Sequence, residues 1–342
     1  MKKLLLICFL ITIFLGITIG ANAKYMWNAG AAPEGTTSYV CIGVLSETAN
    51  TYTKDVFMTP IAFSKSLVGL KAFDQKQAVS MYASAQQLEQ IINKEGPFSP
   101  ETYKWSAPVA QMMWLWAEDE FFLIRKEDAD KIKNYSDLAN RPVFCHMLGT
   151  GTYEILKAVF SPQCLDIWDT MDIKSFEYSH TSDALKLKEV DAVAGYSSGG
   201  AIVGFIQEVL ARTDSVMLVP TPEELEKALK AFSFLSAATM RPETYGQDVG
   251  LTKTIKNLGI GYVYIVDPDV PEEFVYQVVK AAFENATEMS NVAGVWKKFA
   301  EDPWEFNFPY LLKYKKMGVA IHPGALRYFR ELGHDTKMLG LE

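Results

Sequence analysis

Short apolar runs typical of β-strands alternate with amphipathic runs typical of helices over most of this chain. Such alternation predicts an α/β fold, in which helices cover the faces of a sheet. The chain has 342 residues, and domains usually have about 100–150. We therefore expect two α/β lobes rather than one small core. No internal repeat or low-complexity tract interrupts the pattern.

The first 23 residues differ from the rest of the chain. Lys2 and Lys3 precede an apolar run from Leu4 to Ile19, which is followed by Ala21-Asn22-Ala23. A basic start, an apolar middle and a small-x-small site are typical of a secretory signal peptide. We expect residues 1–23 to be cleaved and the mature protein to be exported. An uncleaved membrane anchor is the alternative, because the run approaches the length that spans a bilayer.

Charge and cysteine content narrow the possible partners. The chain has 33 Lys and Arg against 41 Asp and Glu, a net charge of −8, so no nucleic-acid partner is expected. Cys41, Cys145 and Cys164 are too few for a disulfide framework. Buried free thiols are expected, and a Cys145–Cys164 pair remains open. The four histidines are scattered and no CxxC or HExxH spacing occurs, so we expect neither a metal site nor a cofactor.

Two strand-like segments divide the chain. Leu115–Ile124 leads away from a first lobe, and Phe234–Met240 is the expected return crossing. This predicts lobe I from residues 24–125 and 235–342, with lobe II, residues 126–234, inserted into it. Further elements are expected at Asn134–Leu138 (a capped turn), Pro142–Cys145 (strand), Tyr153–Phe160 (helix), Val190–Ala194 (strand), Pro220–Phe232 (helix) and Pro271–Ser290 (helix).

A small-residue loop, Gly149-Thr150-Gly151-Thr152, stands between a predicted strand and a predicted helix. Glycines allow close approach of a ligand to the backbone. The free N–H groups of the helix start, with the two threonine hydroxyls, favour an anion such as a carboxylate. Glu154 replaces the third glycine of a dinucleotide fingerprint, and the Gly-Lys-Ser/Thr ending of a phosphate-binding loop is absent. An ordinary βα turn with a threonine cap is the alternative.

The segment Gly195-Tyr196-Ser197-Ser198-Gly199 satisfies the G-x-S-x-G pattern of a nucleophile elbow. Asp267 and His322 follow Ser197 in the order of an α/β-hydrolase, so an exported serine hydrolase is one hypothesis. Patterns of common small residues arise often by chance. We therefore favour a ligand-facing turn and expect no catalytic residue.

Two further features are ambiguous on their own. Gly35-Thr36-Thr37-Ser38-Tyr39 is predicted as a hydroxyl-rich turn, a feature that is also common in surface loops. Trp105, Trp114 and Trp116 suit either the hydrophobic core or the wall of a site for a flat ligand.

The C-terminal third carries a specific resemblance. Ile321-His322-Pro323-Gly324-Ala325 followed by Arg327–Glu331 is similar to the C-terminal signature of the TAXI branch of TRAP transporter solute-binding proteins. Val275–Asn285 resembles the long helix of that family. Arg241–Gln247 resembles a proline-containing turn, and the glycine loop at 149–152 resembles the family's GSGT segment.

This resemblance implies a type II periplasmic-binding-protein fold, in which two lobes joined by a hinge close over a ligand. It implies a periplasmic receptor that captures a small carboxylate and hands it to a TRAP-type membrane permease, without catalysis. An amino acid such as glutamate, a 2-oxo acid and a dicarboxylate are the expected ligand types. A sensory binding domain that signals to a membrane receptor is an alternative.

The resemblance also implies ligand-binding residues: Gly149, Thr150, Gly151 and Thr152 of the glycine loop in lobe II, and Ser38, Tyr39 and Ser66 in lobe I. The ligand-facing turn proposed above adds Tyr196 and Ser197. The sequence departs from the family in lobe I, where Gly69 and Val79 replace an asparagine and an aspartate. His146 and Met147 replace smaller residues before the glycine loop. Ligand identity therefore stays open.

Overall fold

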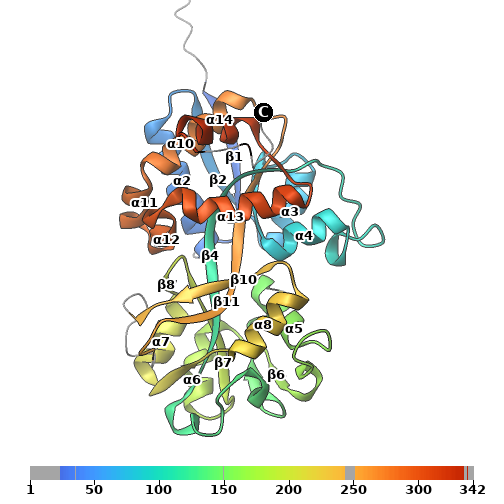
Figure 1. The fold of residues 1–342 in the computed structure, drawn as a ribbon, viewed down its shortest axis with the longest axis vertical. Helices are drawn as coiled ribbons and strands as arrows, with labels where there is room; N and C mark the ends of the chain where they lie inside the picture. The colour runs from blue at the N-terminus through green and yellow to red at the C-terminus, as the bar shows by residue number, and fades with distance from the viewer. Residues whose placement is uncertain (1–23, 35, 149, 243–250, 335–336, 338–342) are drawn as a thin grey trace, which may run out of the picture.

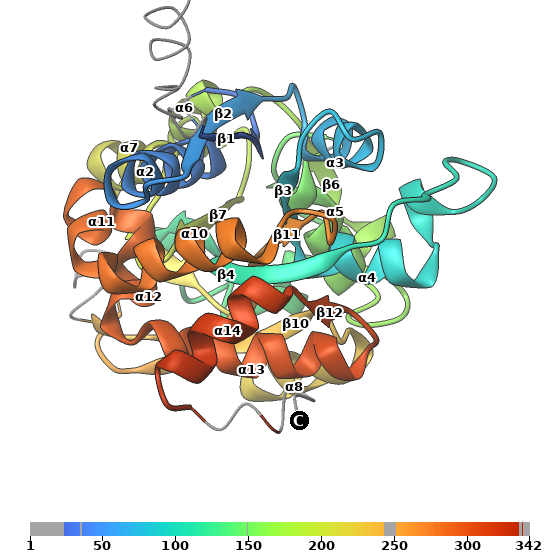
Figure 2. The same cartoon turned by 90° about the horizontal axis from the view of Figure 1, so that it is seen from above.

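The computed structural model describes residues 24–34, 36–148, 150–242, 251–334 and 337. Two α/β lobes are stacked along the long axis of the molecule (Figure 1), and Figure 2 looks along that axis from above. The predicted fold class is therefore confirmed. The leader and Gly149 lie outside the described residues, as do residues 243–247 of the family-like turn. Within the described residues, no helix combines the length and apolar character that crossing a membrane requires.

Lobe I, the upper lobe in Figure 1, combines the beginning and the end of the chain. Its N-terminal elements are β1 (Tyr25–Ala31), α2 (Thr37–Tyr52), β2 (Val56–Ala62), α3 (Ser66–Asp74), β3 (Ser80–Ser84) and α4 (Ala85–Asn93). Its C-terminal elements are α10 (Glu272–Glu284), α11 (Ala286–Val292), α12 (Lys297–Glu301), α13 (Pro303–Lys316), β12 (Ala320–Ile321) and α14 (Pro323–Glu331).

Lobe II is built from the middle of the chain. Its first elements are β5 (Pro142–Phe144), α5 (Gly151–Phe160), β6 (Asp172–Lys174), α6 (Thr181–Lys186) and β7 (Ala192–Ser198). They are followed by β8 (Ala201–Ile202), α7 (Gly204–Arg212), β9 (Ser215–Leu218), α8 (Pro222–Ala231) and β10 (Leu235–Met240). Thr221 and Glu224 form a capping box at the start of α8, as the sequence predicts.

Two long antiparallel strands, β4 (Ala110–Arg125) and β11 (Ile255–Val266), pass through both lobes. The strand order is β2-β1-β3-β11-β4-β7-β5-β6. The start of β4 pairs with β12 and its end with β7 and β9. Likewise β11 pairs first with β10 and then with β3. One sheet therefore continues from lobe to lobe.

The position of the lobe boundary follows from this register. Ala117 of β4 pairs with Gly261 of β11. On one side of this pair the two strands bond to β12 and β3 of lobe I, and on the other side to β7 and β10 of lobe II. The sequence predicts lobe boundaries at residues 125 and 234. We propose a different division, at the Ala117–Gly261 pair. It assigns β10, which lies beside α8 in the lower lobe (Figure 1), to lobe II.

The sequence of β4 explains its length. All 16 residues are buried, and they are predominantly apolar and aromatic, as in a strand covered on both faces. Phe122 and Ile124 pack into the larger hydrophobic cluster, whereas Phe121 and Leu123 pack into a second cluster in lobe II. This alternation is the two-residue period of a strand.

Two local expectations differ from the structure. The residues Gly195–Ser198 continue strand β7 rather than forming a turn, and the turn begins at Gly199. The expected helix 271–290 is broken at Asn285 into α10 and α11. Cys41, Cys145 and Cys164 are buried free thiols.

A buried ion pair holds lobe I against the strands that join the lobes. Lys298 of α12 donates to Asp119 of β4 at 2.7 Å, and the Ser197 hydroxyl donates to the same carboxylate at 2.8 Å. The backbone N–H of Lys298 also donates to the carbonyl of Gly199 at 3.1 Å. Gly199 has φ +57°, and a Cβ there would lie 1.8 Å from the Val295 carbonyl oxygen. Only glycine permits this approach.

We predict that Lys298→Ala lowers the free energy of unfolding by roughly 3–5 kcal/mol, because removing one partner of a buried ion pair strands the other charge. Asp119 is 0% exposed. The matched control is Lys297→Ala at the exposed neighbouring position. Urea unfolding of both variants measures the difference. Equal stability of the two would show that the pair contributes nothing.

Candidate functional site

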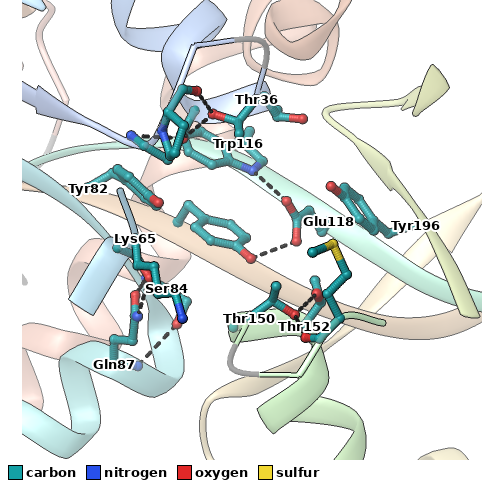
Figure 3. Close-up of a pocket in the computed structure, with 18 of the residues that line it drawn as sticks. Thr36, Lys65, Tyr82, Ser84, Gln87, Trp116, Glu118, Thr150, Thr152 and Tyr196 are labelled. Carbon is teal, nitrogen blue, oxygen red and sulfur yellow. Dashed lines mark hydrogen bonds between the residues drawn. The ribbon is translucent and has the colours of Figure 1, made fainter. Parts of the chain in front are cut away.

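A cavity of about 400 Å³ lies between the lobes (Figure 3). Small-molecule sites commonly measure roughly 300–1,000 Å³. Polar residues at the starts of four helices line it, together with aromatic residues of the strands. The helix-start residues are Thr36, Thr37 and Ser38 of α2, Lys65 and Ser66 of α3, Ser84 and Gln87 of α4, and Thr150, Gly151 and Thr152 of α5.

The same four-residue pattern begins a helix in each lobe. Thr36 caps α2 by accepting from the N–H of Tyr39 at 3.3 Å, and Thr150 caps α5 by accepting from the N–H of Tyr153 at 3.3 Å. In each case the hydroxyl two residues after the cap lies 3.2 Å from the cap hydroxyl. Thr-x-Ser/Thr-Tyr thus places two helix N-termini on one cavity, one from each lobe.

The starts of α3 and α4 complete the lobe I side. Ser84 caps α4 in a capping box with Gln87, and the Gln87 amide donates to the Ser66 hydroxyl at 2.8 Å. Lys65 is exposed at this rim, where it precedes α3. Helix N-termini carry unpaired N–H groups and a partial positive charge. These positions therefore favour an anionic group of a ligand.

The middle of the cavity has the opposite character. Glu118 of β4 is 4% exposed and lines it. Tyr262 donates to its Oε2 at 2.6 Å, and Trp116 donates to its Oε1 at 3.2 Å. Burial, with a smaller contribution from Glu120, raises the pKa of Glu118 to about 8. Figure 3 shows its carboxyl between the rings of Trp116 and Tyr196.

Behind Glu118, a second carboxyl is buried with a histidine. Oε2 of Glu120 lies 3.6 Å from Nε2 of His146, and neither atom has a hydrogen-bond partner. Burial raises the pKa of Glu120 well above its usual range and lowers the pKa of His146 to about 3. Burial therefore favours the uncharged form of both groups, so their contact lacks the charges of an ion pair.

The structure brings most of the predicted site residues together. The cavity is lined by Ser38, Ser66, Thr150, Gly151, Thr152 and Tyr196. Ser38 and Tyr39 belong to the first turn of α2 rather than to a loop.

Two predicted residues do not line the cavity. The Tyr39 hydroxyl is 3.5 Å from Glu34, in an exposed contact, because its ring leaves the helix on another side from Ser38. Ser197 is buried against Asp119. Successive residues of a strand face opposite ways, so Tyr196 reaches the cavity and Ser197 cannot.

The cavity residues that sequence reasoning missed include three on strands, Tyr82, Glu118 and Tyr262, and two at helix starts, Lys65 and Gln87. An acidic residue inside an apolar strand was the available signal for Glu118. Trp116 was considered as either core or site, and it is both buried and part of the cavity wall.

The three residues of the hydrolase hypothesis have other partners. Ser197 is bonded to Asp119, and Lys76 contacts Asp267. His322 accepts at Nδ1 from the N–H of Gly324 at 3.1 Å, and its Nε2 lies 3.0 Å from the Val270 carbonyl. Because Ser197 continues a strand, the sharp turn of a nucleophile elbow is also missing.

The C-terminal signature serves packing. His322 caps α14, and a Cβ on Gly324 would lie 2.3 Å from the backbone oxygen of Glu272 at the start of α10. The glycine therefore lets α14 approach α10 closely. None of these residues lines the cavity described above.

Two lobes sharing a continuous sheet, with a polar cavity between them, define a type II periplasmic-binding-protein fold. The chain belongs to the NMT1-like family, whose model matches residues 29–333.

Solved structures with similar folds include the periplasmic aliphatic sulphonate binding protein SsuA of Escherichia coli, with 12% identity, coverage of 90% of this chain and 84% of that chain, and a TM-score of 0.43. An amino acid ABC transporter substrate-binding protein of Streptococcus pneumoniae bound to L-arginine has 10% identity, 81% and 92% coverage and a TM-score of 0.42. The GluR0 ligand-binding core with L-glutamate has 11% identity, 81% and 99% coverage and a TM-score of 0.45.

We predict that Glu118→Gln stabilises the ligand-free protein at pH 8 and that the gain shrinks towards pH 5. A carboxyl whose folded pKa is about 8 and whose unfolded pKa is near 4.3 costs stability as pH rises between these values. The difference at pH 8 is on the order of a few kcal/mol. Thermal unfolding of both proteins across this range is the measurement. A difference that grows towards pH 5 would contradict the assignment.

Proposed function

We propose that this protein is an exported, periplasmic solute-binding receptor of a TRAP transporter of the TAXI type, which captures a small carboxylate between its lobes and delivers it to the membrane permease. The observation that carries the proposal is the pair of matched helix starts at Thr36 and Thr150, one from each lobe, on one cavity. The leader-like N-terminus supports export, and the C-terminal signature supports the TAXI branch.

The site favours an anion by local means. The net charge of −8 repels one at long range, so the donors must lie close to it. The N–H groups of the first turns of α2 and α5, the hydroxyls of Ser38 and Thr152, and the ammonium of Lys65 supply such donors. No step of this binding requires catalysis.

Closure follows from the placement of these donors. A carboxylate held by α2 alone contacts only lobe I, whereas a closed cleft adds α5 of lobe II. The closed state then binds the ligand more tightly and becomes the populated state. Strands β4 and β11, which connect the lobes at Ala117 and Gly261, are the proposed hinge. The permease would recognise the closed form.

We predict that Thr150→Val with Thr152→Val weakens binding of a carboxylate ligand at least about tenfold, because hydrogen bonds to a charged group contribute roughly 1.5–3 kcal/mol each. The ligand comes from a thermal-shift screen of amino acids, 2-oxo acids and dicarboxylates. Isothermal titration calorimetry then measures the affinity of wild type and variant.

Thr221→Val is the matched control. Thr221 caps α8 as Thr150 caps α5, so both changes cost about 1 kcal/mol of stability, but Thr221 is not among the cavity residues. The control is expected to keep wild-type affinity. A screen in which no carboxylate binds, or equal affinity of all three proteins, would reject the proposed site.

A further inference from the structure

We propose that Glu118 binds a cationic nitrogen of the ligand, so that the cleft selects zwitterions, carrying a carboxylate and an ammonium group, over 2-oxo acids and dicarboxylates. The inference rests on the proposed function, since the carboxylate end occupies the helix starts. It gives Glu118 a role in ligand specificity, because binding of a carboxylate at the helix starts does not explain a buried acid in the middle of the cavity.

The first argument is the missing cation. Among the described residues, no Lys or Arg nitrogen lies within 4.0 Å of the Glu118 carboxyl, although ion pairs are common elsewhere in the structure. Its neighbour Glu120 is acidic, and His146 is neutral because burial lowers its pKa. A buried carboxylate is costly unless a positive charge accompanies it. A ligand ammonium would supply that charge.

The second argument is the shape of the surroundings. Trp116 and Tyr262 are stacked at 4.5 Å between ring centroids, and Tyr82 lies 5.7 Å from Trp116. With Tyr196, these rings line the cavity around Glu118. Aromatic faces attract cations. A second ligand carboxylate at this position would instead lie against the aromatic faces and the Glu118 carboxyl, neither of which favours a negative charge.

The third argument is the remaining hydrogen-bonding capacity. Trp116 and Ser198 both donate to Oε1, and Tyr262 donates to Oε2. These donors fix the carboxyl in one orientation. Each carboxylate oxygen has two lone pairs, so Oε2 retains one acceptor site for a ligand N–H.

One alternative uses the same residue differently. With a pKa of about 8, Glu118 is largely protonated in the empty cleft at pH 7, and a neutral carboxylic acid can donate to a ligand carbonyl. Glutamine is a neutral isostere that also donates, so Glu118→Gln separates the two cases. A carbonyl acceptor would still bind to the glutamine, whereas an ammonium would lose its counter-charge.

Proton release provides a second readout. The titratable groups around Glu118 are Glu120 on β4 and four tyrosines that line the cavity, Tyr82, Tyr178, Tyr196 and Tyr262. Burial raises the pKa of each of these groups and so favours its uncharged form. Binding an ammonium would ionise Glu118, which sends its proton to the buffer. Binding a 2-oxo acid would not require this step.

The test compares matched ligand pairs: L-glutamate with 2-oxoglutarate, L-leucine with 4-methyl-2-oxopentanoate, and L-alanine with pyruvate. Calorimetry on the mature protein at pH 7 is run in two buffers of different ionisation enthalpy. We expect the amino acid of the binding pair to bind at least about 30-fold tighter than its partner, because a close buried charge pair contributes about 2 kcal/mol or more and only the amino acid forms one with Glu118. We also expect proton release.

Glu118→Gln is expected to lower the affinity for the amino acid at least about 30-fold and to abolish proton release. The affinity for the 2-oxo acid is expected to change less than about threefold. Glu226→Gln, an exposed change of the same charge in lobe II, is expected to match wild type. Tighter binding of the 2-oxo acid, or a preference that survives Glu118→Gln, would overturn this inference and leave carboxylate binding intact. Binding of no pair member would overturn both.

Discussion

The path of β4 through both lobes is the constraint on which the rest of the structure depends. Three consecutive acids, Glu118, Asp119 and Glu120, stand in the middle of a fully buried strand. Because a strand alternates its side chains, Asp119 turns to Lys298 and α12, whereas Glu118 and Glu120 turn to the side of the cavity and His146. One strand thus supplies both the ion pair near the hinge and the polar centre of the cleft.

Much of the fold and half of the site could be predicted from sequence, because both depend on local signals. A strand, a small-residue loop and a capped helix identify the start of α5, and the same Thr-x-Ser/Thr-Tyr pattern marks α2. A run of hydroxyl residues is typical both of a turn and of a helix start, so the sequence alone predicts a turn at residues 35–39. Ser197 was misplaced because strand β7 runs four residues further than its apolar core, Val190–Ala194, predicts.

Glu118 was missed for a different reason. The identity of a buried acid's neighbours depends on strand register, and the partners of Glu118 come from β7 and β11, about 80 and 140 residues away along the chain. The family resemblance does not point to Glu118 either. The residues that carry it, His322 and Gly324, pack α14 on α10 and do not line the cavity.

The two halves of the proposed site would contribute differently to binding. The helix starts at Thr36 and Thr150 belong to different lobes, so in the proposed mechanism only the closed state brings both to the anionic group, and that group would drive closure. Glu118 lies one residue from the proposed hinge pair, on a strand that both lobes share. Its distance to a ligand in the cleft would therefore change little on closure. We infer that Glu118 selects the ligand by charge, whereas the helix starts bias the equilibrium between the open and closed states.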